Sequence, residues 1–108
     1  MENEILNAQI VDTFLGIEEH GIFTSFLRIS TSAFVVEVGG YDLETKSTEF
    51  IRTFLTTLEK VRWEDLAGTY IRIVKDGDKV HKIGHIMKDK WLDFDEFFKQ
   101  VEGEVVNE

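Results

Sequence analysis

The chain has 108 residues, enough for one domain with a modest core, and its formal net charge of −9 argues against binding of duplex nucleic acid, which requires a dense cationic surface. It contains no cysteine, so disulfides and cysteine-based metal sites are excluded. No basic region followed by an apolar stretch opens the sequence, and no apolar run approaches membrane-spanning length. We therefore expect a cytoplasmic protein without a secretory signal.

Charge is distributed unevenly along the chain. Residues 1–45 contain eight acids against Arg28, and residues 93–108 contain six acids against Lys99. Residues 46–92 contain seven acids and ten bases, so a basic middle lies between two acidic ends.

Alternation of apolar and polar residues predicts three strands in the first part of the chain, over residues 9–17, 22–30 and 33–38. Short links between them are typical of an antiparallel meander. Residues 1–7 are expected to form a loosely held arm.

A pair of glycines, Gly39 and Gly40, precedes Tyr41 at the end of this meander. Paired glycines permit an exit turn toward the next element, and they also permit close approach of a ligand to the backbone. The spacing does not match the phosphate-binding glycine fingerprints of dinucleotide or triphosphate folds. We keep both interpretations and include Gly39, Gly40 and Tyr41 among the candidate ligand-binding residues.

A long amphipathic helix is predicted over residues 48–61, with Ser47 as its N-cap. Its apolar positions form one broad stripe that we expect to cover the sheet: Phe50, Ile51, Phe54, Leu55, Leu58 and Val61.

A β-hairpin is predicted next, with strands over residues 70–74 and 80–87 around Gly77. A three-residue loop would place Ile71 and Ile73 on the same face as Ile83, His85 and Met87. A two-residue loop would instead pair Ile71 and Ile73 with Gly84 and Lys82. We favour the first register because it collects more apolar side chains on one face.

A short second helix is predicted from Asp93 to about residue 101, because Asp93 and Glu96 resemble a capping box. Gly103 would end it, and residues 103–108 are expected to fray. The resulting expectation is a single α+β domain over residues 1–108. It has an antiparallel sheet of about five strands (a three-stranded meander, then a hairpin), one long helix packed on a face and a short C-terminal helix. Exposed sheet edges favour a homo-oligomer.

Catalytic and metal-binding patterns are weak. His81 and His85 are four residues apart on a predicted strand, which separates them by about 13 Å, too far to share one ion. Serines and histidines are present, but no motif links a nucleophile to a base. We expect no enzyme activity, no metal and no cofactor.

The most suggestive cluster is His85, Lys88, Asp89, Lys90 and Trp91. Lysine offers cationic donors, histidine a donor that switches near neutral pH, and tryptophan a face on which a base can stack. With Arg72 and Lys82 on adjoining strands, these residues could bind a phosphate-bearing nucleotide. Alternatively, Trp91 belongs to the core and the lysines are solvated neighbours of acids.

Three segments resemble a family of short, poorly characterised proteins of tailed phages and prophages: GGYDL at 39–43, WEDLAGTYIRI at 63–73 and IGHIMKDKW at 83–91. The resemblance covers most of the chain between residues 10 and 91. It implies an accessory protein in the host cytoplasm, a class that includes inhibitors of host defence, but it assigns no catalytic residues.

Two functions follow as hypotheses. The first is a non-enzymatic phage protein that sequesters a nucleotide signal of host defence. The second is an acidic inhibitor that mimics nucleic acid and occupies a host nuclease or CRISPR effector. The first is favoured because the acids form no regular row. The expected partner is thus a small nucleotide or a host defence protein, and neither duplex nucleic acid nor a membrane.

Overall fold

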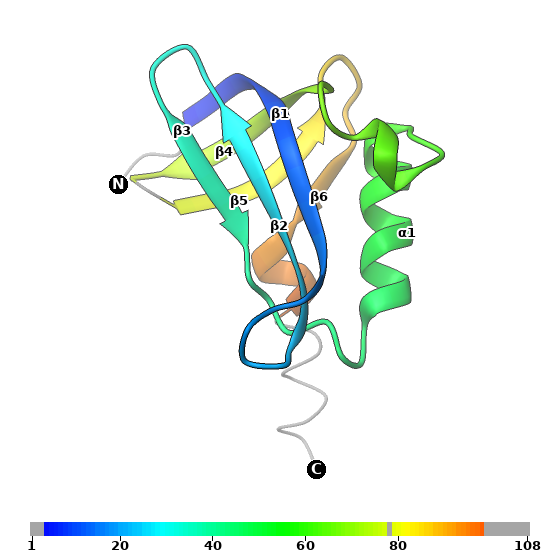
Figure 1. The fold of residues 1–108 in the computed structure, drawn as a ribbon. Helices are drawn as coiled ribbons and strands as arrows, with labels where there is room; N and C mark the ends of the chain where they lie inside the picture. The colour runs from blue at the N-terminus through cyan, green and yellow to red at the C-terminus, as the bar shows by residue number, and fades with distance from the viewer. Residues whose placement is uncertain (1–3, 78, 99–108) are drawn as a thin grey trace.

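A computed structural model describes residues 4–77 and 79–98 (Figure 1). It confirms the α+β class: a six-stranded antiparallel sheet with one helix packed against it and a short C-terminal helix. In the sheet the strands lie in the order β3-β2-β1-β4-β5-β6. The elements are β1 (Glu4–Ile17), β2 (Phe23–Ser30), β3 (Val35–Gly39), α1 (Ser47–Leu58), the 3-10 turn η1 (Trp63–Asp65), β4 (Tyr70–Asp76), β5 (Lys79–His85) and β6 (Trp91–Asp93).

Strand β1 is longer than predicted and joins the two halves of the sheet. Its first half pairs with β4, from Glu4 opposite Lys75 to Gln9 opposite Tyr70. Its second half, from Gln9 to Ile17, pairs with β2, and this pairing has an irregularity between Ile10 and Asp12. The prediction of a loose arm is therefore wrong for residues 4–7, because β4, some 65 residues later, supplies their hydrogen-bond partners.

The β4–β5 hairpin combines the two registers considered from the sequence. Ile73 lies opposite Ile83 and Ile71 opposite His85, which confirms the favoured pairing. Next to the turn, however, Asp76 lies opposite Lys79, and an irregularity between Val74 and Lys75 reconciles the two registers. A β-bulge of this kind inserts one extra residue on one strand.

The second hairpin strand ends at His85, so Met87, which was predicted to share the apolar face, is instead 84% exposed in the following loop. Residues 86–90 form this loop, and β6 returns beside β5 with Leu92 opposite Ile83. The sixth strand has only three residues, too few for a recognisable alternating pattern.

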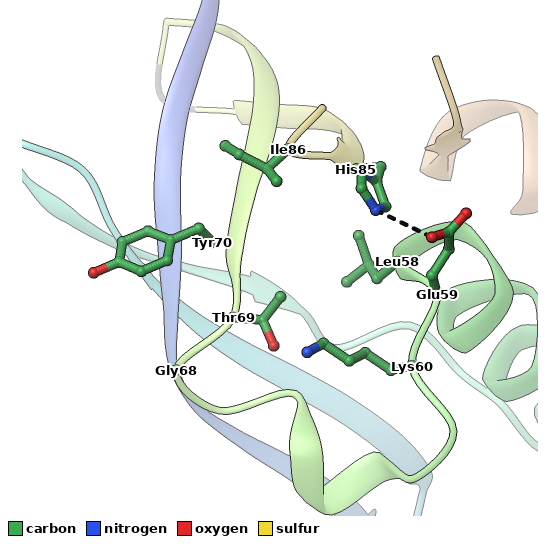
Figure 2. A pocket seen from close by; sticks show the side chains of 8 residues that line it. All are labelled: Leu58, Glu59, Lys60, Gly68, Thr69, Tyr70, His85 and Ile86. Carbon is green, nitrogen blue, oxygen red and sulfur yellow. Dashed lines mark ion pairs between the residues drawn. The ribbon is translucent and has the colours of Figure 1, made fainter. Parts of the chain in front are cut away.

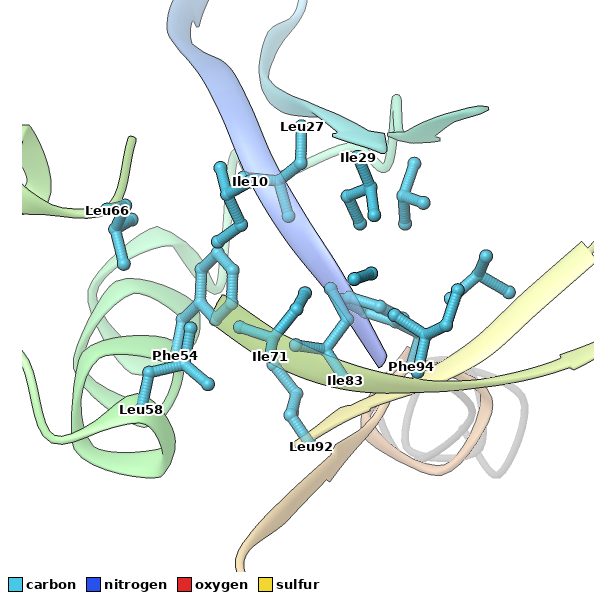
Figure 3. Close-up of a cluster of buried hydrophobic side chains, with 14 of the residues drawn as sticks. Ile10, Leu27, Ile29, Phe54, Leu58, Leu66, Ile71, Ile83, Leu92 and Phe94 are labelled. Atoms are coloured by element: carbon cyan, nitrogen blue, oxygen red, sulfur yellow. The ribbon is translucent and has the colours of Figure 1, made fainter. Parts of the chain in front are cut away.

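Helix α1 covers one face of the sheet and carries the core (Figures 1 and 3). Phe54 is fully buried at its centre, with Phe50 and Leu58 on either side. Two details of the prediction are wrong: Lys46 rather than Ser47 occupies the N-cap position, and the helix ends at Leu58. Val61 lies beyond that end and is 88% exposed, so it is not part of the stripe.

The short C-terminal helix begins as predicted. The Asp93 carboxylate accepts a hydrogen bond from the backbone N–H of Glu96 at 3.0 Å, and residues 94–98 are helical. Phe94 is buried, and the Phe98 ring stacks on Tyr41 with centroids 4.1 Å apart. The remaining predicted turn to residue 101 and the predicted frayed tail lie outside the described residues. In the described part of the chain, no helix is long and apolar enough to span a membrane.

Candidate ligand-binding site

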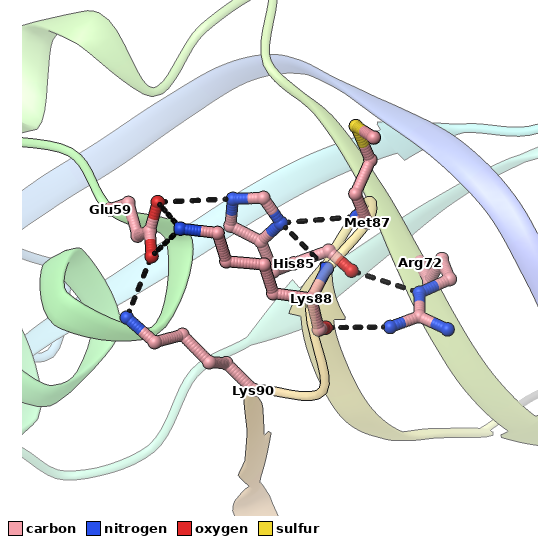
Figure 4. A network of polar contacts seen from close by, with 6 residues as sticks. All are labelled: Glu59, Arg72, His85, Met87, Lys88 and Lys90. Carbon is pink, nitrogen blue, oxygen red and sulfur yellow. Dashed lines mark hydrogen bonds and ion pairs between the residues drawn. The ribbon is translucent and has the colours of Figure 1, made fainter.

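The loop of residues 86–90 is held in place by hydrogen bonds at both of its ends (Figure 4). The Arg72 guanidinium donates to the backbone carbonyls of His85 and Lys88, each at 2.8 Å. The Nδ1 atom of His85 accepts the backbone N–H groups of Met87 at 3.0 Å and Lys88 at 3.1 Å. These contacts explain why arginine and histidine occur here: they satisfy backbone groups that a loop leaves unpaired.

The same geometry selects the tautomer of the neutral His85 ring. An Nδ1 atom that accepts two hydrogen bonds carries no proton, so the ring proton lies on Nε2. That Nε2 atom is 3.5 Å from a carboxylate oxygen of Glu59. Neither ring nitrogen of His85 is then available to take a proton from a substrate.

Glu59 joins the end of α1 to the loop. It follows the last helical residue with a left-handed φ of 58°, and its backbone N–H closes the helix onto Leu55 and Thr56. Its carboxylate accepts hydrogen bonds from Lys88 and Lys90, each at 2.8 Å (Figure 4). These hydrogen bonds, that from Lys88 first, hold the pKa of the Glu59 carboxyl at about 2, below its ordinary value of 4.5.

Trp91 packs on the sheet face opposite the core. Its indole N–H donates to Asp89 at 3.0 Å, and the Arg72 guanidinium carbon lies 4.7 Å from the centre of its ring. Beneath the ring is Gly84, where a Cβ atom would come within 2.4 Å of the Trp91 ring. The Trp91 ring therefore packs directly on the backbone of β5, and only glycine at position 84 leaves room for it.

A cavity of about 380 Å³ lies between the end of α1 and the start of β4 (Figure 2). This volume falls in the range of small-molecule sites. Lys60 directs its ammonium toward Thr69, and within the described residues this ammonium has no carboxylate partner (Figure 2). Tyr70 is 63% exposed, and its ring points away from Lys60 and Thr69 (Figure 2). The residues that line the cavity are Leu58, Glu59, Lys60, Gly68, Thr69, Tyr70, His85 and Ile86.

The structure brings five predicted site residues together and separates the rest from them. Contacts connect Arg72, His85, Lys88, Lys90 and Trp91, although only His85 is among the residues that line the cavity. Lys82 lies further along β5, opposite Val74 and Asp93.

The glycine pair forms the exit turn, one of its two interpretations. A Cβ atom at Gly39 would come within 2.1 Å of the Ser25 carbonyl oxygen, and the Gly40 N–H donates to that oxygen at 2.9 Å. The Tyr41 carbonyl accepts the Thr24 hydroxyl at 2.6 Å, and its ring stacks on Phe98. Burial raises the pKa of the Tyr41 hydroxyl. Gly39 and Tyr41 line a different hollow, described below.

Sequence reasoning missed Glu59, Lys60, Thr69 and Tyr70 as members of a site. Glu59 and Lys60 are neighbours at the predicted end of the helix, but nothing in the sequence indicates that the start of β4 lies beside them. Among the described residues, no group of three or more histidines and acids is arranged to hold a metal ion.

Comparison of the chain with protein-family models, with curated proteins and with solved structures finds no match in any of the three.

Proposed function

We propose that the protein binds a small phosphate-bearing ligand of the nucleotide class in the cavity at the end of α1. The observation that carries this proposal is the Lys60 ammonium, which lines a cavity of about 380 Å³ without a carboxylate partner among the described residues. A lysine in such a position attracts an anion. Tyr70 also belongs to the lining of the cavity and is exposed, but its ring points away from Lys60, so stacking on a bound base requires this ring to rotate (Figure 2).

The surroundings of the cavity add further positive charge. Lys60, Lys88, Lys90 and Arg72 provide four bases, and Glu59 and Asp89 provide two acids, so this corner has a formal charge of +2 in a protein of −9. Lys88 and Lys90 share the one Glu59 carboxylate. Exposed ion pairs of this kind are weak, so a phosphate can draw either lysine away from Glu59.

We also propose that the ligand is bound without being turned over. Both ring nitrogens of His85 are engaged, Nδ1 by two backbone N–H groups and Nε2 toward Glu59. A general base needs an unprotonated nitrogen within reach of the substrate. In the tailed-phage setting that the sequence resemblance implies, such a protein would sequester a nucleotide signal of host defence.

Calorimetry with a panel of linear and cyclic nucleotides tests the proposal. Replacing Lys60 by methionine keeps most of the length of the side chain and removes its charge. Loss of one charge-assisted hydrogen bond should weaken binding about tenfold to a hundredfold. The matched control is Arg52→Met, because Arg52 is an exposed base on α1 that does not line the cavity.

The control variant should bind like the wild-type protein. If no nucleotide in the panel gives heat with the wild-type protein, the proposal is wrong. Equal losses in the two variants would show that overall charge, rather than this cavity, attracts the ligand.

A further inference from the structure

A groove runs between the edge of the sheet at β3 and the turn that joins β4 to β5. It consists of two adjoining hollows of about 350 and 390 Å³, both of which reach Val80. The first hollow is lined by Phe34, Val35, Val36, Lys75, Gly77 and Val80. The second is lined by Glu37, Val38, Gly39, Tyr41, Asp76, Lys79 and Val80. One wall of the groove is therefore strand β3 along its whole length.

The first end of the groove is apolar. Val35 is 61% exposed and Phe34 36% exposed, which is high for side chains of this kind next to a core. The Lys75 ammonium lies 5.3 Å from the centre of the Phe34 ring, but this ammonium is already paired with Glu4 at 3.4 Å. This end can therefore accept an apolar side chain without leaving a cation unpaired.

The second end of the groove is acidic. Glu37 from β3 and Asp76 from β4 both line this hollow. Glu37 also lies opposite Arg28 in the β2–β3 pairing, but the Arg28 guanidinium pairs with Asp12 at 3.4 Å. Neither carboxylate has an ion-pair or hydrogen-bond partner within the described part of the chain. The nearby Lys79 does not neutralise them, because its ammonium pairs with Asp95 at 3.3 Å.

Strand β3 also offers its backbone to this groove. It is the last strand in the order of the sheet and pairs with β2 on its other side. No backbone hydrogen bond joins β3 to the β4–β5 turn among the described residues. Unpaired N–H and C=O groups on a sheet edge accept an additional strand.

We propose that this groove binds an extended, basic segment of a partner protein, which adds to β3 as a further strand. An apolar side chain of the segment occupies the end at Phe34 and Val35. A lysine or arginine further along the segment lies between Glu37 and Asp76 and supplies their missing partner.

Charge complementarity selects this occupant over a second copy of the chain. Two copies that paired through β3 would each bring Glu37 to the shared edge, and like charges across such a contact are unfavourable. Residues 4–45, the part of the chain that contains β3, have seven acids against Arg28, which also favours a basic partner.

Fluorescence anisotropy with a labelled peptide (Thr-Val-Thr-Arg-Thr) tests the proposal, because its valine and arginine are two residues apart and share one face of an extended strand. The wild-type protein should bind this peptide and should not bind the same peptide with glutamate in place of arginine. The double variant Glu37→Gln, Asp76→Asn should weaken binding about tenfold, because it removes roughly two exposed ion pairs with the peptide. The control is Glu19→Gln, which removes an exposed acid that lines neither hollow and should leave the affinity unchanged.

Backbone recognition has its own test. Only alternate N–H groups of an added strand face its neighbour, so N-methylation of one alternate set of peptide residues should abolish binding and methylation of the other set should not. Equal effects of both sets would overturn strand addition. Absence of binding by the arginine peptide, or an equal loss in the Glu19→Gln control, would overturn the proposal as a whole, as would self-association of the protein through β3.

Discussion

Replacing Phe54 by alanine should lower the free energy of unfolding by about 3–5 kcal/mol, the range for emptying a large aromatic site. Phe54 is 0% exposed, and its ring lies 5.8 Å from that of Phe50 and 5.7 Å from that of Trp63. The Trp63 indole N–H donates to the Thr13 hydroxyl at 3.0 Å. Because this hydrogen bond restrains the tryptophan, the vacated space cannot collapse easily, which favours the upper part of the range.

Urea denaturation followed by far-UV circular dichroism measures this loss. Val61→Ala is the matched control, because Val61 belongs to the apolar pattern in the sequence but is 88% exposed. It should change the free energy of unfolding by less than about 0.5 kcal/mol. A loss below about 1 kcal/mol for Phe54→Ala would refute the packing described above, and so would equal losses for the two variants.

Two further predictions concern the loop and its supports. Gly84→Ala should lower the free energy of unfolding, measured by urea denaturation, by about 1–3 kcal/mol, because its Cβ atom would come within 2.4 Å of the Trp91 ring. In a Trp91→Ala background, the same Gly84→Ala change should cost much less. An equal cost in both backgrounds would contradict the steric cause. Glu59 has a pKa of about 2 in the folded protein against 4.5 ordinarily, so its carboxylate contributes stability that is present above about pH 5 and is lost as pH falls toward 2. The stability difference between wild type and Glu59→Gln, measured by denaturation across pH, should therefore be constant near neutrality and shrink in acid, and a difference that persists at low pH would argue against the ion pairs.

Local patterns in the sequence predicted much of the fold. The spacing of Phe50, Phe54 and Leu58 identified the face of α1 that covers the sheet, and these three residues are buried. The capping pattern at Asp93 predicted the start of the second helix. Both features depend on neighbours within a few residues, which is why the sequence alone sufficed.

The errors arose where distant partners decide the structure. Residues 4–7 form a strand because β4 pairs with them, and β6 exists because Leu92 lies opposite Ile83. Val61 fits the helical spacing, but the helix ends at Leu58, before the pattern does. The spacing of apolar residues indicates which face of a helix is buried, but it does not indicate at which residue the backbone hydrogen bonds of the helix end.

The candidate site shows the same division. His85, Lys88, Lys90 and Trp91 were found because they are close in the sequence. Glu59 was missed because it lies about 30 residues earlier, and its carboxylate binds both lysines. Lys88 and Lys90, which the sequence suggests as ligand-binding donors, are thus partly neutralised by Glu59 in the fold. Lys60, which was not among the predicted site residues, lines a cavity.

The two proposed sites lie at opposite ends of the β4–β5 hairpin. Tyr70 and His85 line the cavity, whereas Asp76 and Lys79 line the groove. Strand β4 has seven residues, so the two sites are about 20 Å apart along it. This distance exceeds the Debye length of about 8 Å at physiological ionic strength, so the lysines at one end do not neutralise the acids at the other. One acidic protein can therefore attract an anion at one end of the hairpin and a basic segment at the other, and each proposal stands or falls by its own experiment.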